Sequence, residues 1–406
     1  MNNTYNIIVI GGGAAGFFAA INIAEQNPDL SVAILEKGKA GLQKVKISGG
    51  GRCNVTHAEF IPKDLSLNYP RGEKELLGPF HSFMTGDTIG WFADRGVELK
   101  TEDDGRMFPV TNTSETIIDC FLSETRRLGI EVLTGQAVKN IQQNNESWLL
   151  ETTKTKFRCD QLVIATGSNP KMWDILKDLG HKMVNAVPSL FTFNIKDPRI
   201  KDLAGISTFA EVKIPNSGLE SEGPLLITHW GMSGPGILKL SAWGARDLND
   251  RNYQFSILVN WVPGFNQESI SEELTRLKES SAKQKVIKYA KFELPKRLWV
   301  KLVIASGIPE DEVWANVSKK QLDQLALQLC KGEFSVNGKS TFKDEFVTAG
   351  GVDLKEIDFK TFRSKKYENL YLAGEVLNID AITGGFNFQN AWTGGFIAAK
   401  AIAGIN

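Results

Sequence analysis

The stretch Ile7-Ile8-Val9-Ile10-Gly11-Gly12-Gly13-Ala14-Ala15-Gly16 decides the fold of this chain. Four apolar residues lead into the spacing G-x-G-x-x-G, and a helical pattern follows from about Ala14 to Glu25. A second apolar run, Val32 to Leu35, ends in Glu36, twenty positions after Gly16. Strand, glycine turn, helix, strand and acid in this order form a dinucleotide-binding fingerprint. The sequence therefore predicts a nucleotide-binding α/β domain at its N-terminal end.

Each glycine of this turn has a separate physical task. Gly11 permits the tight turn after the strand, Gly13 lets a pyrophosphate approach the backbone, and Gly16 lets helix and strand pack closely. The helix then directs its free N–H groups and its dipole at the phosphates. Glu36 would accept hydrogen bonds from the adenosine ribose, and its carboxylate disfavours the 2′-phosphate of NADP at this site.

Composition limits the classes of protein to which the chain can belong. Its 406 residues suggest two domains, and 42% hydrophobic and 23% charged residues are ordinary values for a globular protein. Basic and acidic residues number 47 each, which disfavours a polyanionic partner for the molecule as a whole. We expect no membrane span, because no run of about 18 apolar residues occurs, and no signal peptide, because a strand begins almost at once. We also expect no metal site and no structural disulfide, because the four cysteines are scattered. A cytoplasmic location fits these features.

Further along the chain, the pattern alternates between helical and β segments. Helices are expected near Asp87 and Ser114, and short strands between about 130 and 165. The region from about 190 to 260 reads as β, the region from 267 to 330 as helical and charged, and a last helix is expected over 388–403. We predict a domain of residues 1–190 and 343–406, built from both chain ends, and an inserted domain over 191–342. A separate C-terminal unit is the alternative.

Two strand ends favour FAD over NAD as the dinucleotide. Val163-Ile164-Ala165-Thr166-Gly167 reads as a buried strand that ends in Ala-Thr-Gly, and Leu370 to Gly374 reads as another that ends before Glu375. In two-domain flavoproteins such ends lie near the dinucleotide and the flavin. No second G-x-G-x-x-G follows a strand, so NADH or NADPH, as a possible electron donor, would dock only transiently.

Three motifs, which follow one another along the chain, narrow the range of protein families that the chain can resemble. They are Ser48-Gly-Gly-Gly-Arg-Cys-Asn-Val-Thr56, Thr228-His-Trp-Gly-Met-Ser-Gly-Pro235, and Gly374-Glu-Val-Leu377 followed by Thr383-Gly-Gly-Phe-Asn387. With them the chain resembles, over nearly its whole length, the BaiN/YhiN-type bacterial flavoproteins, also described as aminoacetone-oxidase-family FAD-binding enzymes. The resemblance implies an NAD(P)/FAD-dependent oxidoreductase with a Rossmann-like FAD domain. It also implies an insert made of a β pseudobarrel (about 191–265 and 331–342) and a small helical bundle (about 266–330).

The resemblance also assigns cofactor contacts to positions of this sequence. The residues that it implies for the ADP half are Gly11, Gly13, Ala14, Ala15, Gly16, Glu36, Lys37 and Val138. Those along the pyrophosphate and flavin are Ser48, Gly51, Arg52, Cys53 and Asn54. Thr166 and Gly167 join the candidates because their strand end would lie near the dinucleotide. Those around the ribityl chain and flavin ring are Gly374, Glu375, Gly385, Phe386, Asn387 and Gln389. The chain departs from the usual pattern at His57, Asn378 and Phe386, which bears on the substrate side.

Three residues are candidates for catalysis. Cys53, beside Arg52, could form a thiolate near the flavin, but a small packed side chain is the favoured interpretation. Arg52 could stabilise negative charge on the reduced flavin or pair with a carboxylate or pyrophosphate. His229 stands in a Gly/Ser/Pro loop and could donate or accept a proton, with His57 as a weaker alternative.

These features favour hydride transfer between flavin N5 and a small organic substrate, most simply an NAD(P)H-dependent reduction of an enone-like compound. One branch of the family resembles reductases of conjugated enones in steroid-like bile acids. The alternatives are a flavin oxidase of an amine or amino ketone, and an RNA-binding or tRNA-modifying flavoprotein. The last would use the basic segment Lys283–Lys301, for which we favour a solvated amphipathic face with Val286, Ile287 and Leu294 inward. The sequence leaves the oligomeric state open.

Overall fold

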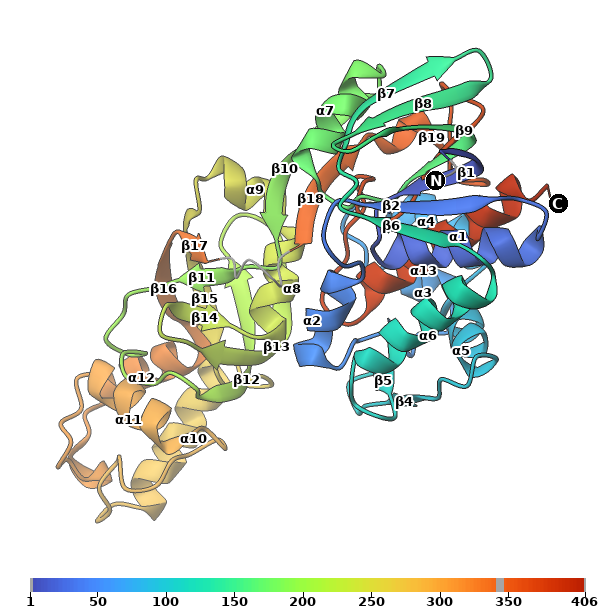
Figure 1. Ribbon diagram of the computed structural model, residues 1–406. Coiled ribbons are helices and arrows are strands. Elements are labelled where there is room, and N and C mark those ends of the chain that lie inside the picture. Colours follow the sequence, from blue (N-terminus) through green and yellow to red (C-terminus); the bar gives the residue numbers. More distant parts are fainter. Residues whose placement is uncertain (1–2, 341–346, 405–406) are drawn as a thin grey trace. The chain divides into compact units, whose positions relative to one another are not determined.

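The chain forms two compact units in a computed structural model that describes residues 3–340 and 347–404 (Figure 1). One unit contains Met1–Val187 and Val347–Asn406, and the other contains Pro188–Phe346. Both ends of the chain therefore belong to the first unit. The predicted domain bounds stay a prediction. The predicted boundary between residues 342 and 343 lies outside the described residues.

The first unit alternates strands and helices, as βαβ units do. Its strands are β1 (Thr4–Ile10), β2 (Val32–Glu36), β3 (Thr56–His57), β4 (Leu99–Thr101), β5 (Arg106–Pro109), β6 (Glu131–Thr134), β7 (Val138–Asn144), β8 (Ser147–Thr152), β9 (Lys156–Ile164), β18 (Val347–Val352), β19 (Ile357–Asp358), β20 (Arg363–Ser364) and β21 (Leu370–Leu372). Its helices are α1 (Ala14–Gln26), α2 (Gln43–Gly51), α3 (Pro62–Ser66), α4 (Glu73–Phe80), α5 (Thr85–Ala93), α6 (Glu115–Arg127), α7 (Pro170–Asp178), the 3₁₀ turn η2 (Leu354–Glu356) and α13 (Phe386–Ile402). Strand β10 (Met183–Ser189) pairs with β18 at the unit boundary.

A parallel sheet is the centre of this unit. Strands β21, β9, β1, β2 and β6 lie in that order and all run parallel, with Ile7 of β1 opposite Val32 of β2. Residues Ile7–Ile10 are buried, as expected for a strand covered on both faces. The hairpin of β7 and β8 extends from β9. This sheet confirms the predicted Rossmann-like α/β fold class.

The last helix of the chain packs directly on the first. A Cβ built on Gly395 of α13 would lie 3.1 Å from the carbonyl oxygen of Ala15 and 3.2 Å from the nitrogen of Ala19. Glycine at this position therefore lets α13 approach the backbone of α1 more closely than any other residue would. This contact fixes the C-terminal segment against the first βα turn.

The second unit combines an antiparallel sheet with helices. The sheet order is β16-β15-β12-β13-β14-β11-β17. Its strands are β11 (Thr192–Asn194), β12 (Ser207–Ile214), β13 (Leu219–Ile227), β14 (Gly231–Ser233), β15 (Gln254–Asn260), β16 (Gly332–Asn337) and β17 (Lys339–Ser340). Its helices are α8 (Pro235–Trp243), α9 (Ala245–Asp250), α10 (Gln267–Ser280), α11 (Lys296–Ala305), the 3₁₀ turn η1 (Trp314–Asn316) and α12 (Lys319–Lys331).

The helical expectation for 267–330 holds for α10, α11 and α12 but not for the two stretches between them. Residues 281–295 and 306–318 form turns, loops and the 3₁₀ turn η1, and some of their backbone groups bond across from one stretch to the other: Val286 N donates to Glu312 O, and Trp314 N donates to Gln284 O. Val286 and Leu294 are nonetheless buried, as predicted. Within residues 3–340 and 347–404, no helix has the length and apolar content that crossing a bilayer would require.

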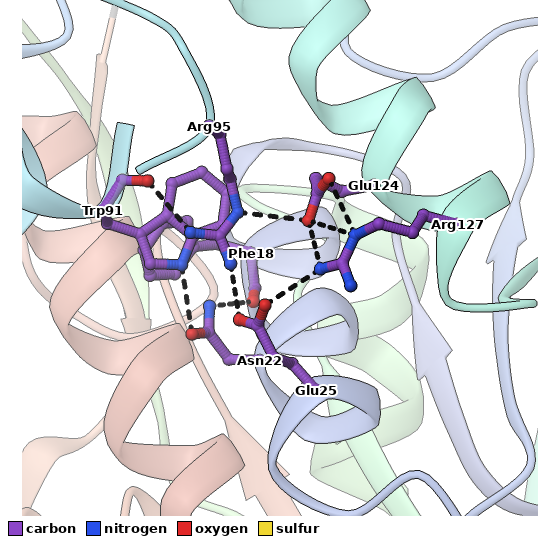
Figure 2. A network of polar contacts seen from close by, with 7 residues as sticks. All are labelled: Phe18, Asn22, Glu25, Trp91, Arg95, Glu124 and Arg127. Atoms are coloured by element: carbon purple, nitrogen blue, oxygen red, sulfur yellow. Dashed lines mark hydrogen bonds and ion pairs between the residues drawn. The ribbon is translucent and has the colours of Figure 1, made fainter. Parts of the chain in front are cut away.

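A polar network joins the helices α1, α5 and α6 of the first unit (Figure 2). Asn22 of α1 donates to Phe18 O at 2.7 Å and accepts from Trp91 Nε1 of α5 at 3.2 Å. The Arg95 guanidinium lies 3.7 Å from the centre of the Trp91 ring and donates to Trp91 O. The buried amide of Asn22 is thus hydrogen-bonded on both sides, as burial of a polar group requires.

Two carboxylates complete this network. Arg95 pairs with Glu25 of α1 and lies 3.3 Å from Glu124 of α6, while Arg127 lies 2.9 Å from Glu25 and 2.6 Å from Glu124 (Figure 2). The hydrogen bond from Arg127 is the main cause that holds the pKa of Glu124 below its ordinary value. A carboxyl whose pKa is lowered by folding contributes stability above its unfolded pKa, about 4.3, and loses that contribution as the pH falls through its folded pKa.

We expect Glu124→Gln to lower the free energy of unfolding at neutral pH by about 1–2 kcal/mol, because Glu124 is 12% exposed and has two cationic partners. The variant and the parent should converge only as the pH falls through the lowered folded pKa of Glu124, because the parent carboxyl becomes protonated only there. Urea unfolding across a pH series measures both effects. Glu368→Gln, at an exposed position, is the control. If the difference in the free energy of unfolding between Glu124→Gln and the parent is the same at every pH, this account is contradicted.

Candidate functional site

The first βα turn lies at the carboxyl end of the parallel sheet. Gly11 has φ +111°, and a Cβ built on it would overlap the carbonyl oxygen of Ala165 at the end of β9. A Cβ on Gly16 would overlap the carbonyl oxygen of Gly11. Gly13 differs, because no atom of the described residues lies within 4 Å of a Cβ built there. The turn is therefore closed around Gly11 and Gly16 and open at Gly13, where a phosphate would approach.

Glu36 is fixed at the end of β2, beside this turn. Its Oε2 accepts from Gly12 N at 2.8 Å and its Oε1 accepts from Gly38 N at 2.6 Å. Each carboxylate oxygen keeps a further lone pair for a ribose hydroxyl. Gln136 N donates to Glu36 O, which brings the segment before Val138 alongside, and the Lys37 side chain is exposed. The positions expected to hold the ADP half thus lie together.

The second glycine loop contains an unusual run of left-handed residues. Helix α2 loses helical geometry at Ser48, and Gly49, Gly50 and Gly51 have φ of +57°, +69° and +84°. A Cβ on Gly49 would lie 2.9 Å from Asn54 N, so the loop folds tightly on itself. Successive backbone N–H groups in such a turn form a concave surface that suits anions.

Two buried polar atoms at these loops fit a bound cofactor. Asn54 Oδ1 and Thr166 Oγ1 are shielded from solvent, and neither has a hydrogen-bond partner within the part of the chain that the structure describes. A buried polar atom without a partner costs stability, so a ligand that bonds to it is favoured. Asn54 belongs to the second glycine loop and Thr166 follows β9. With the open face at Gly13, they fit FAD.

The C-terminal segment brings a third loop to the same place. Gly374 follows β21 with φ +76°, and a Cβ there would lie 3.0 Å from Ala15 Cβ of α1. Glu375 Oε2 lies 2.7 Å from Lys44 Nζ of α2 and 3.5 Å from a Cβ built on Gly167. The residues predicted to surround FAD from β1, β9, α2 and β21 are therefore linked by direct contacts in one unit.

The start of α13 is positioned by glycine as well. Gly385, with φ +98°, precedes the helix, and a Cβ on it would lie 2.5 Å from Thr56 O and 2.9 Å from Asn54 Oδ1. Asn387 Oδ1 accepts from Ala381 N at 3.1 Å and closes the loop before the helix. The free N–H groups of the first turn of α13 thus lie next to the second glycine loop.

Gln389 and Phe386 have mainly interior contacts. Gln389 is fully buried, and its Oε1 accepts from Thr56 Oγ1 at 2.6 Å and from Thr88 Oγ1 at 2.9 Å. Phe386 stacks on the His57 ring with centroids 4.5 Å apart. Gln389 therefore holds β3 against α13 from below the loop, and its predicted contact with the cofactor stays a prediction.

Arg52 has a carboxylate partner. Its Nη1 lies 2.5 Å from Glu102 Oε1, and its guanidinium lies 3.9 Å from the centre of the Phe108 ring. Arg106 pairs with the same Glu102 at 3.2 Å. This geometry agrees with the carboxylate-pairing alternative for Arg52, and its role toward a reduced flavin stays a prediction.

Cys53 is fully buried in a left-handed conformation, with φ +60°. Burial raises the pKa of its thiol to about 12. A thiol with that pKa is protonated at neutral pH, so the geometry favours a packed side chain over a thiolate.

His229 belongs to the second unit, in the turn between β13 and β14. Thr228 Oγ1 accepts from Trp230 N and Gly231 N, both at 3.2 Å, which fixes the turn and leaves the His229 side chain exposed. In the first unit, His57 Nδ1 lies 3.0 Å from Gly384 O. Both histidines remain candidates for proton transfer.

Sequence reasoning missed the ion pair that fixes the C-terminal loop. Arg71 Nε donates to Asp380 Oδ1 at 2.6 Å, a second bond joins Arg71 Nη2 to Asp380 Oδ2, and Asp380 is fully buried. Tyr69 OH donates to Phe386 O at 2.6 Å close by. Only the chain topology brings 69–71 to 380–386, and no motif in the sequence signals it.

Comparisons with known proteins give the family of this chain. The family description "HI0933-like protein Rossmann domain" matches residues 5–401. Ribosomal RNA dihydrouridine synthase of Haemophilus influenzae is 32% identical over 98% of each chain, and the 3-dehydro-bile acid delta(4,6)-reductase of Clostridium scindens is 26% identical over 97% of this chain and 98% of that protein. The solved 3-ketosteroid delta1-dehydrogenase of Sterolibacterium denitrificans has the same fold, with TM-score 0.52 and 10% identity over 99% of this chain and 100% of that chain. These matches confirm the resemblance found in the sequence.

A pair of substitutions tests the cofactor site. Gly13→Ala adds a methyl group in open space, so the apoprotein should keep its stability but lose FAD affinity, because the methyl occupies the phosphate position. Gly16→Ala overlaps the Gly11 carbonyl and should destabilise the protein itself, by roughly 1–3 kcal/mol. Thermal unfolding with and without FAD separates the two effects. FAD binding by Gly13→Ala at parental affinity would rule out this placement of the pyrophosphate.

The neutral thiol of Cys53 gives a second test. Iodoacetamide at neutral pH should label Cys53 slowly in the native protein and quickly after unfolding, because only the thiolate reacts. Peptide mass spectrometry reads the labelling rate. Cys120, which is 8% exposed with a pKa raised to about 11, is the internal comparison and should react sooner. Rapid native labelling at Cys53 would restore the thiolate hypothesis.

Proposed function

The chain belongs to the HI0933-like Rossmann-domain family of FAD-dependent oxidoreductases, and on that premise we propose that it reduces a carbon–carbon double bond conjugated with a carbonyl group. The substrate that we propose is uridine in ribosomal RNA, with dihydrouridine as the product. The observation that carries this proposal is the full-length similarity to the Haemophilus synthase.

The two named relatives share one chemistry. Dihydrouridine is uridine whose C5=C6 bond has been reduced, and that bond is conjugated with the C4 carbonyl. The double bonds of a 3-dehydro-Δ4,6-bile acid are conjugated with the C3 carbonyl in the same way. In both, a hydride adds to a carbon remote from the carbonyl and a proton adds to the adjacent carbon. Enone reduction and RNA modification, which the sequence raises as separate hypotheses, would thus be the same type of reaction on different substrates.

The residues of the first unit would prepare this reaction. FAD, when bound, supplies a hydride at N5. The open backbone at Gly13 and the N-terminal turn of α1 would hold the pyrophosphate, and Asn54 and Thr166 would bond to the cofactor with atoms that are otherwise unpaired in the described part of the chain. The N-terminal turn of α13 would stabilise negative charge that develops on the ring.

We further propose that His229 donates the proton to the carbon next to the carbonyl. Its side chain is exposed in a turn that Thr228 fixes, so it can meet a substrate as large as RNA. Histidine is suited to this task because its ordinary pKa lies near neutrality. NADH or NADPH is the proposed source of the electrons, and the cytoplasmic location predicted from the scattered cysteines is the one that a ribosomal RNA substrate requires.

The function is tested under anaerobic conditions with unmodified ribosomal RNA transcribed in vitro. NADH or NADPH should bleach the flavin absorbance, and the transcript should restore it while dihydrouridine forms, as measured by nucleoside mass spectrometry. A flavin that reoxidises only with oxygen and releases peroxide would instead indicate the oxidase alternative. Reoxidation by a steroid enone but not by RNA would move the substrate to the bile-acid class.

His229→Gln tests the proton donor in the same assay. We expect turnover to fall by about 100-fold while flavin reduction by the nicotinamide is unchanged, because only the protonation step loses its donor. His81→Gln, at another exposed histidine, is the control. Equal turnover in the two variants would exclude His229 from proton transfer.

A further inference from the structure

We propose that residues 283–301 of the second unit form a docking surface for RNA, which holds the phosphates of the transcript and stacks an unpaired base on Tyr289. This surface, called here the basic segment, rests on the proposed function in that it assigns the binding of its RNA substrate. It lies between α10 and α11 and includes the first turns of α11 (Figure 1).

The basic segment concentrates positive charge in a chain that is neutral overall. It holds seven of the 47 basic residues and one of the 47 acidic residues, so the remainder of the chain is net negative. A local field of this kind attracts a polyanion even when the total charge is zero. Within the described residues, none of its seven basic side chains has a carboxylate within ion-pair distance, and most of them are exposed.

Residues 283–295 of the basic segment form turns and loop rather than a helix, and buried contacts beneath them fix their fold. Trp299 Nε1 donates to Val286 O at 3.0 Å, Lys285 bridges to Val313, and Val286 and Leu294 are buried. The lysines therefore project from a packed base. Glu312, whose backbone carbonyl accepts from Val286 N, has a side chain that already accepts from Val313 N and Asn316 Nδ2.

One of the cations, Lys296, is placed where a cation costs stability. It is the first residue of α11, whose first turn contains no acid. A helix N-terminus carries partial positive charge, so cations there cost stability and anions gain it. The next residue, Arg297, donates to Asp202 O. An external anion, such as a phosphate, would offset the positive charge at this helix end.

Tyr289 supplies the aromatic surface. It is 53% exposed, and Lys288 Nζ lies 5.1 Å from the centre of its ring. Exposed aromatic rings among basic residues are the usual means of binding single-stranded nucleic acid, since bases stack on the ring while cations bind phosphates. A lipid surface is less suited, because the large aliphatic residues Val286, Leu294 and Leu298 point inward.

The test compares two triple variants of the full-length, FAD-loaded protein. Lys285, Lys288 and Lys296 are each replaced by Gln in one variant, and Lys171, Lys177 and Lys400, which are equally exposed in the first unit, in the control. Binding to unmodified ribosomal RNA transcribed in vitro is measured across a salt series. The first variant should bind about 10- to 100-fold more weakly, and its salt slope should fall by about 2–3, while the control matches the parent.

Two substitutions test Tyr289: one removes the aromatic ring and the other keeps it. Tyr289→Ser should weaken binding by about 5- to 100-fold with an unchanged salt slope, and Tyr289→Phe should bind as the parent does. Flavin reduction by the nicotinamide should be the same in all variants, because the basic segment lies in the other unit from the candidate cofactor site.

The outcomes separate this surface from the proposed function. Lysine-dependent RNA binding without dihydrouridine formation would support the surface and overturn the proposed substrate. Dihydrouridine formation by the parent, with RNA binding equal in both triple variants, would overturn the surface and leave the function standing. If the lysines matter for phosphatidylglycerol vesicles or polyglutamate but not for the transcript, the surface is not an RNA site.

Discussion

The close approach of backbone to backbone at the first βα turn is the constraint on which this structure depends. Gly16 faces the carbonyl of Gly11, and Gly11 faces the carbonyl of Ala165, each with no room for a side chain. These contacts bring α1 down onto the ends of β1 and β9 and leave Gly13 open. The phosphate-binding face exists because the rest of the turn is filled by the protein itself.

The same tight packing explains how both ends of the chain build one site. Gly395 lets α13 pack on α1, and Gly374 lets the loop after β21 meet Ala15. The Arg71–Asp380 pair then holds the loop before α13. Three loops that are distant in sequence thus meet at one edge of the sheet. Asn54 Oδ1 and Thr166 Oγ1 are buried at these loops and have no hydrogen-bond partner among the described residues, so a ligand could supply the missing bonds.

The fold was largely predictable because its signals are local. The strands at β1 and β2 and the helices at α1 and α13 follow from apolar runs and glycine spacing. The regions 281–295 and 306–318 were wrongly expected to be helical, because some of their backbone groups bond across from one region to the other and periodicity does not report such contacts. The Arg52–Glu102 pair and the interior network of Gln389 were also hidden, since each joins residues that only the tertiary fold brings together. The glycine motifs come together in the fold, whereas the sequence does not reveal which of their neighbouring side chains bond to the interior.

The claim that one cofactor site is built from three separate loops is tested most directly by hydrogen exchange of the apoprotein and the FAD-loaded protein. The account predicts slower exchange on loading in three segments together: 11–16, 48–54 and 374–389. The strands β12 and β13 of the second unit serve as the internal reference and should not change. Protection of 11–16 alone would mean that only the nucleotide half is held by these loops, and would contradict the site as described.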